Sequence, residues 1–83
     1  MKTIAMSTKA IRQMKKLGKS EQAAIYQALR TMAAEWPNAR GVKALVGRHD
    51  YRLRLGELRV IFEVEGEEIF ITEVLRRNER TYH

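Results

Sequence analysis

The stretch YRLRLGELRVIFEV, residues 51–64, predicts two strands joined by a two-residue turn. Apolar and polar residues alternate on both sides of Gly56-Glu57, which is the pattern of a half-buried strand. A two-residue loop with glycine first suits a type II′ hairpin turn, and such a turn sets Arg54 opposite Arg59. The face that we expect to be buried then carries Tyr51, Leu53, Leu55, Leu58, Val60, Phe62 and Val64.

The opposite face of this hairpin carries Arg52, Arg54 and Arg59, with Ile61 and Glu63 beside them. Like charges directly across a strand pair destabilise it by a few tenths to about 1 kcal/mol. One explanation is a solvated face whose charge prevents edge-to-edge pairing. The other is an anion site, because the planar guanidinium fork binds phosphate bidentately and lysine does not.

The whole chain, residues 1–83, predicts one α+β domain. Its order is β-α-α-β-β-β, with a helical hairpin packed on a small, mainly antiparallel sheet in two layers. Ser7 is the expected N-cap of the first helix, Gly18 ends it, and Pro37 stops the second. The expected elements are a strand at 2–6, helices at 8–17 and 20–36, a loop at 38–49, and strands at 51–55, 58–64 and 69–75.

Composition limits the class of protein. The chain has 83 residues, a formal net charge of +6 and no cysteine, which fits a reducing cytoplasm. No apolar run approaches the roughly 18 residues of a membrane span, and the first residues lack a signal-peptide pattern. Only His49 and His83 offer imidazole, so we expect no metal and no cofactor. A basic domain of this size favours nucleic acid or acidic proteins as partners.

More arginines follow the last predicted strand. Arg76 and Arg77 end that strand, and Arg80 and Tyr82 come just after it. Stacking on an aromatic ring and phosphate contacts from arginine are what single-stranded RNA recognition requires. The five cations at 52, 54, 59, 76 and 77 therefore favour an RNA site.

Residues 45–82, LVGRHDYRLRLGELRVIFEVEGEEIFITEVLRRNERTY, resemble the RelE/ParE superfamily of bacterial type II toxins. The strand and two helices that precede this stretch also fit the β-α-α opening of the family, so the resemblance covers nearly the whole chain. The family pattern is met by Leu45, Gly47, Tyr51, Arg52, Arg54, Gly56, Arg59, Val60, Ile61, Phe62, Val64, Val74, Arg77 and Tyr82.

This resemblance implies a cytoplasmic toxin that a cognate antitoxin protein neutralises. RelE-like members are ribosome-dependent endoribonucleases, which cut mRNA in the A site. The ribose 2′-OH attacks the adjacent phosphate, and no metal takes part. We favour this mRNA interferase branch. The alternatives are a ParE-like toxin that poisons DNA gyrase without nuclease activity, and a non-toxic basic domain that binds nucleic acid.

The resemblance also implies roles for single residues. Arg52 and Arg54 match two basic positions of the first hairpin strand, and Arg59 matches an arginine that contacts phosphate. Arg77 matches the arginine that ends the last strand, and Tyr82 matches the tyrosine that stacks on the substrate base. These five are the expected catalytic residues, and the further expected RNA contacts are Arg76, Arg80 and His83.

The general base is left open by this assignment. RelE itself has lysines where this chain has Arg52 and Arg54. Arginine is effectively always protonated and is a poor base. Other branches of the family use a glutamate or a histidine, and the candidates in this chain are Glu63, Glu79, His49 and His83.

Overall fold

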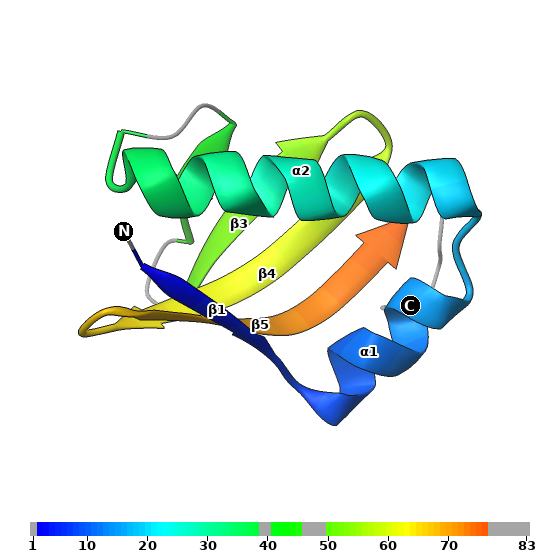
Figure 1. The fold of residues 1–83 in the computed structure, drawn as a ribbon, viewed down its shortest axis with the longest axis horizontal. Coiled ribbons are helices and arrows are strands. Elements are labelled where there is room, and N and C mark those ends of the chain that lie inside the picture. Colours follow the sequence, from blue (N-terminus) through cyan, green and yellow to red (C-terminus); the bar gives the residue numbers. More distant parts are fainter. Residues whose placement is uncertain (1, 39–40, 46–49, 77–83) are drawn as a thin grey trace.

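The computed structural model describes residues 2–38, 41–45 and 50–76. It confirms the α+β class and shows two helices packed on one five-stranded sheet, with strand order β1-β5-β4-β3-β2 (Figure 1). Strand β1 runs parallel to β5, and all other neighbours are antiparallel. The elements are β1 (Thr3–Met6), α1 (Thr8–Lys15), α2 (Lys19–Glu35), β2 (Val42–Ala44), β3 (Asp50–Leu55), β4 (Leu58–Glu65) and β5 (Glu68–Arg76).

The register of β3 and β4 is the one that the two-residue turn predicts. Arg54 pairs with Arg59, and Tyr51 pairs with Phe62. Gly56 has a φ of 59°, in the left-handed region that an L side chain rarely adopts and that a type II′ turn requires at this position. Because side chains alternate along a strand, this register determines which face each arginine occupies.

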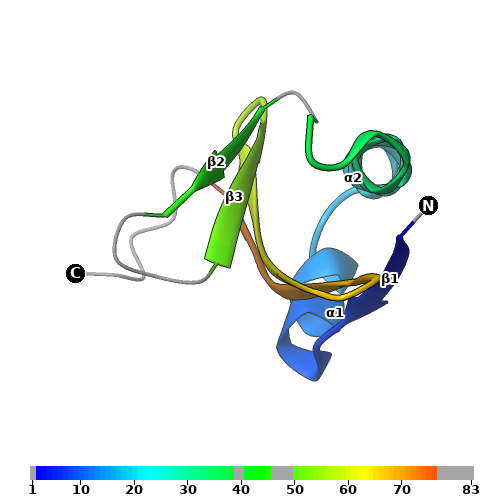
Figure 2. The same ribbon diagram turned by 90° about the vertical axis from the view of Figure 1, so that its left-hand side faces the viewer.

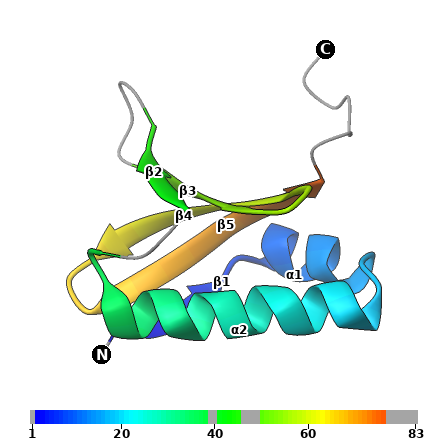
Figure 3. The ribbon, with the colours of Figure 1, turned by 90° about the horizontal axis from the view of Figure 1, so that it is seen from above.

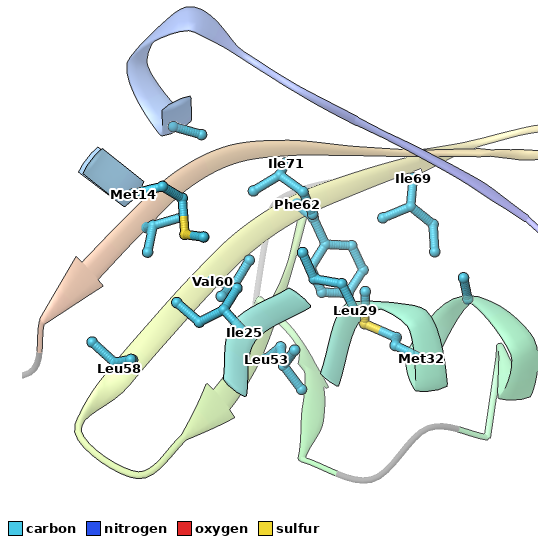
Figure 4. Packing of buried hydrophobic residues seen from close by; sticks show 13 residues of the cluster. Met14, Ile25, Leu29, Met32, Leu53, Leu58, Val60, Phe62, Ile69 and Ile71 are labelled. Atoms are coloured by element: carbon cyan, nitrogen blue, oxygen red, sulfur yellow. The ribbon is translucent and has the colours of Figure 1, made fainter. Parts of the chain in front are cut away.

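The hydrophobic core lies between the two helices and the face of the sheet that is turned toward them (Figure 4). Phe62 is at its centre and is fully buried. Trp36, just after α2, packs edge-on against Tyr51 and Phe62 at centroid distances of 5.0 and 5.7 Å. The predicted core face of the hairpin is therefore confirmed. The buried cluster consists of Ala10, Met14, Ile25, Leu29, Met32, Ala33, Leu53, Leu58, Val60, Phe62, Ile69, Ile71 and Val74.

Helix α1 lies beside the part of β5 that extends past the end of β1, and both helices are on the same side of the sheet (Figure 3). Side chains of its N-cap and of the helix form hydrogen bonds with backbone groups on the exposed edge of β5. The Ser7 hydroxyl donates to the Thr72 carbonyl at 2.9 Å, and the Val74 N–H donates to Gln13 Oε1 at 2.6 Å. Ser7 also caps α1, as predicted, by accepting from the Ala10 N–H. Helix α1 thus protects a strand edge that would otherwise be free to pair.

Most element boundaries differ from the sequence prediction by one or two residues, and one strand was missed. Gly18 is the N-cap of α2, so the helix begins at Lys19 and Ser20 lies inside it. The region 38–49 was expected to be a loop, but Val42–Ala44 forms the edge strand β2. Three residues are too few for a clear alternation, so this strand depends on pairing with β3 rather than on its own pattern.

A β-bulge at Thr72 reverses which face of the sheet the following residues of β5 occupy. Ile61 pairs with Glu73, but its neighbour Phe62 pairs with Ile71, so Thr72 is the extra residue. After the bulge, Val74 points into the core and Glu73 points away from it.

Within the described residues, no helix is both long and apolar enough to cross a membrane.

Candidate functional site

Both helices lie on one side of the sheet, and we call the opposite side the outer face (Figure 2). The strand register places several basic side chains on this outer face. Arg54 lies directly opposite Arg59, and Lys43 of β2 lies directly opposite Arg52. Arg52 and Arg54 are two residues apart on β3, so all four cations share this face near the Gly56 turn. We call Lys43, Arg52, Arg54 and Arg59 the arginine end.

Two donors of the arginine end are buried without a partner. The Nε atoms of Arg52 and Arg59 are inaccessible, and neither makes a hydrogen bond within the described part of the chain. An unsatisfied buried donor costs about 1–3 kcal/mol, and more when it is charged. Such a group in a folded protein requires an explanation. Both guanidinium groups lie on one face, so a bound anion would supply the missing acceptors once these side chains turn their Nε atoms toward it.

Carboxylates do not neutralise these arginines. Among the described residues, Arg52, Arg54 and Arg59 form no ion pair. Glu73 reaches the outer face of β5, but its Oε1 lies 3.1 Å from the Nζ of Lys9 on α1. The positive charge of the arginine end is therefore available to a ligand.

The structure separates Arg76 from the arginine end. Arg76 pairs with buried Leu58 and lies on the helix side of the sheet, where its Nη2 is 2.8 Å from Glu21 Oε1. The same oxygen accepts the Gly18 N–H at 3.2 Å. These hydrogen bonds, that of Arg76 above all, hold the pKa of the Glu21 carboxyl below its usual value. Arg76 fixes the end of β5 to the start of α2.

The remaining predicted site residues fall largely outside the described residues: Arg77, Arg80, Tyr82, His83, Glu79 and His49. Of the candidate bases, the described residues include Glu63. It is exposed on the outer face, and it lies diagonally across from Arg52, because Arg52 pairs with Ile61. Diagonal neighbours on paired strands are about 7–8 Å apart. The described residues contain no group of three or more histidine, cysteine or acidic side chains placed to hold a metal ion.

Two outer-face residues were not anticipated. Lys43 was assigned to a loop, and its position became visible only when β2 was found to pair with β3. Asp50 begins β3 and is buried, with 8% of its surface exposed. The alternation of Asp50, Arg52 and Arg54 was a signal for the longer strand, because the three residues share one face.

No known family model matches the chain, and no curated relative matches it. Solved structures do match, over nearly its whole length. The toxin-antitoxin complex RelBE2 of Mycobacterium tuberculosis gives a TM-score of 0.80 over 92% of this chain and 98% of the matched chain, at 22% identity. The isolated Escherichia coli RelE toxin gives 0.80 over 98% and 89%, at 15% identity. The RelE-RelB complex of Pyrococcus horikoshii gives 0.77 over 94% and 97%, at 23% identity. This chain has the RelE fold.

The RelE fold confirms the architecture that the resemblance of residues 45–82 implied. At these identities the match concerns the backbone, and one fold can support different activities. The feature of this chain that bears on function is the outer face, where the arginine end has two unsatisfied buried donors.

Proposed function

We propose that this chain is the toxin of a type II toxin-antitoxin system, and that it cleaves mRNA in the ribosomal A site without a metal. The RelE fold supports the class of protein. The observation that carries the site is the pair of buried Nε donors at Arg52 and Arg59, which lack acceptors in the described residues. A phosphodiester provides oxygens with the geometry that a guanidinium fork binds.

The arginine end suits the charge changes of RNA cleavage. The 2′-oxygen bonds to phosphorus, the bond from phosphorus to the 5′-oxygen breaks, and a base takes the 2′ proton while an acid supplies one to the 5′-oxygen. The products are a 2′,3′-cyclic phosphate and a 5′-hydroxyl end. Negative charge grows on the phosphorane oxygens, where fixed guanidinium groups stabilise it. Arginine does not serve as the base, and among the described candidates Glu63 is the residue on the correct face.

The segment after β5 would complete this site. Arg77 is proposed as a further phosphate ligand, and Tyr82 is the proposed platform for a base. Stacking of this kind contributes about 1–3 kcal/mol per base. Arg80 and His83 are proposed to contact the RNA beside them.

A cognate antitoxin is the proposed protein partner, and the cytoplasm is the proposed compartment. The solved matches include complexes of RelE with RelB from two archaea. We propose that the antitoxin competes with RNA for the arginine end. An acidic segment is the complementary chemistry, because carboxylates form bidentate pairs with arginine as phosphates do.

The test uses a reconstituted translation system with defined mRNA. The wild-type chain should give cuts in phase with the codons, and Arg59→Ala should lower the cleavage rate about 10²–10³-fold. Arg59→Lys keeps the charge without the fork and should recover only part of that loss. Arg30→Ala, on the exposed side of α2, is the matched control and should cut as the wild type does. Gyrase-dependent DNA breaks with intact mRNA would contradict the proposal.

A further inference from the structure

The two halves of the outer face carry opposite charge. Toward the Gly66 turn, Glu63, Glu65 and Glu68 are all exposed on this face, and we call them the acidic end. Together with Phe70 they line an open hollow of about 280 Å³. The arginine end lies on β2, β3 and the start of β4, whereas the acidic end lies on the second half of β4 and the start of β5, so the fold itself separates the two charges.

Like charges face one another at both ends. Glu65 pairs with Glu68 across β4 and β5, just as Arg54 pairs with Arg59 across β3 and β4. Each such pair destabilises the sheet. Alternating the signs would remove both losses and would keep the same solubility. Solvation alone does not account for this arrangement.

The far side of the acidic end lies beyond the range of electrostatic screening from the arginine end. Glu65 is six residues beyond Arg59 on β4, which is about 20 Å along a strand, and Glu63 lies between them. The Debye length is about 8 Å at physiological ionic strength. Buried Ile61 separates the two ends on β4, and the neighbouring Glu73 is paired with Lys9. A polyanion therefore meets attraction at one end of the outer face and repulsion at the other.

We propose that the acidic end is an electrostatic stop. It confines a single RNA strand to a path across β2, β3 and β4 at the arginine end, so that the binding footprint is short. This inference rests on the proposed function. Repulsive elements of this kind set specificity by excluding wrong binding modes. With four cations in the footprint, log affinity should fall with log salt concentration with a slope of about −3.

The experiment measures binding of fluorescent single-stranded RNA by anisotropy, with 2′-deoxy linkages that cannot be cut. Oligonucleotides of about 4 and about 12 nucleotides span the usual range of single-strand sites. The test variant is Glu65→Gln/Glu68→Gln, which leaves the candidate base Glu63 in place. The control is Gln27→Lys/Glu35→Gln, which adds the same two charges at exposed positions of α2, on the helix side.

The test variant should bind the long RNA about fivefold or more tightly than the wild type, while its affinity for the short RNA changes less than about twofold. The control should shift both lengths equally. Equal gains at both lengths in the test variant, or no gain at all, would overturn the electrostatic stop. If Arg59→Ala binds both RNAs as well as the wild type does, the arginine end is not the RNA site. The proposed function would then fail as well.

Discussion

Replacing Arg54 by glutamate should make the protein more stable. The substitution removes a like-charge pair with Arg59 and creates an opposite-charge pair at the same position. Cross-strand pairs of either kind are worth about 0.2–1 kcal/mol each, and Arg54 is exposed, so screening keeps the net gain near 0.5–1 kcal/mol. A domain of this size shifts its midpoint by about 4–8 °C per kcal/mol. The expected rise is therefore about 2–8 °C.

The assay is thermal unfolding followed by circular dichroism at low salt and at 1 M salt. The gain should shrink at 1 M, where the Debye length is about 3 Å. Arg30→Glu makes the same change in net charge on α2, without a cross-strand partner, and should give a smaller rise. A double-mutant cycle of Arg54→Gln and Arg59→Gln isolates the pairwise energy, which should be repulsive.

Two results would refute this reasoning. One is a fall in the midpoint of Arg54→Glu, and the other is a rise no larger than that of Arg30→Glu. Either result would mean that Arg54 and Arg59 do not repel one another in the folded protein. The stabilised Arg54→Glu variant should also lose RNA cleavage, because it places a carboxylate where phosphate is proposed to bind. A gain in stability with a loss of activity is the signature of a strained functional site.

Three further predictions concern the framework. Gln13→Ala removes the acceptor of the Val74 N–H, so stability should fall by about 1–3 kcal/mol and that amide should exchange its hydrogen faster. Hydrogen bonds hold the pKa of Glu21 below its usual value, so the stabilisation that its carboxylate contributes is present above the unfolded pKa and is lost as the pH falls through the folded pKa. The difference in unfolding free energy between wild type and Glu21→Gln should therefore shrink in acid urea titrations, whereas a constant difference would contradict the ion pair. Phe62→Ala should cost about 3–5 kcal/mol in urea unfolding, and Phe70→Ala, at an exposed position, should cost far less.

The pairing of β3 with β4 was predictable residue by residue because the two-residue turn sets the register of these strands. Gly56-Glu57 leaves a single register, and the period of two then assigns Arg52, Arg54 and Arg59 to one face. The strand pairing that the turn residues predict is the pairing in the structure. The same holds for Ser7, whose side chain caps α1 as the sequence indicated.

The position of Arg76 was not predictable from alternation. Counting by twos from exposed Phe70 places Arg76 on the outer face with the other arginines. The bulge at Thr72 reverses this assignment, and Arg76 instead pairs with Glu21 on the helix side. A bulge arises from how two strands meet, with Thr72 donating its hydroxyl to the Ile61 carbonyl. The sequence of β5 alone does not contain that information.

The short strand β2 was missed for a related reason. It has three residues, and its pairing with β3 is supported by backbone contacts outside the strand, including the Arg54 N–H to the Gly41 carbonyl at 3.0 Å. The φ of Gly41 is 77°, and a Cβ there would lie 3.1 Å from the Arg54 carbonyl oxygen. Glycine at this position was visible in the sequence, but its role depends on a contact with Arg54, 13 residues further along the chain.

The parallel ladder of β1 and β5 has a consequence for the timing of synthesis. Thr3 pairs with Glu68, so the sheet joins the first and last strands of the described chain. Strand β5 lies between β1 and β4, so a growing chain that lacks it leaves β1 without a partner and lacks the core side chains Ile69, Ile71 and Val74. The arginine end then lies on a sheet of β2, β3 and β4 whose core is incomplete. The ribosome that makes this protein therefore has to add β5 before the sheet under the site has its full core.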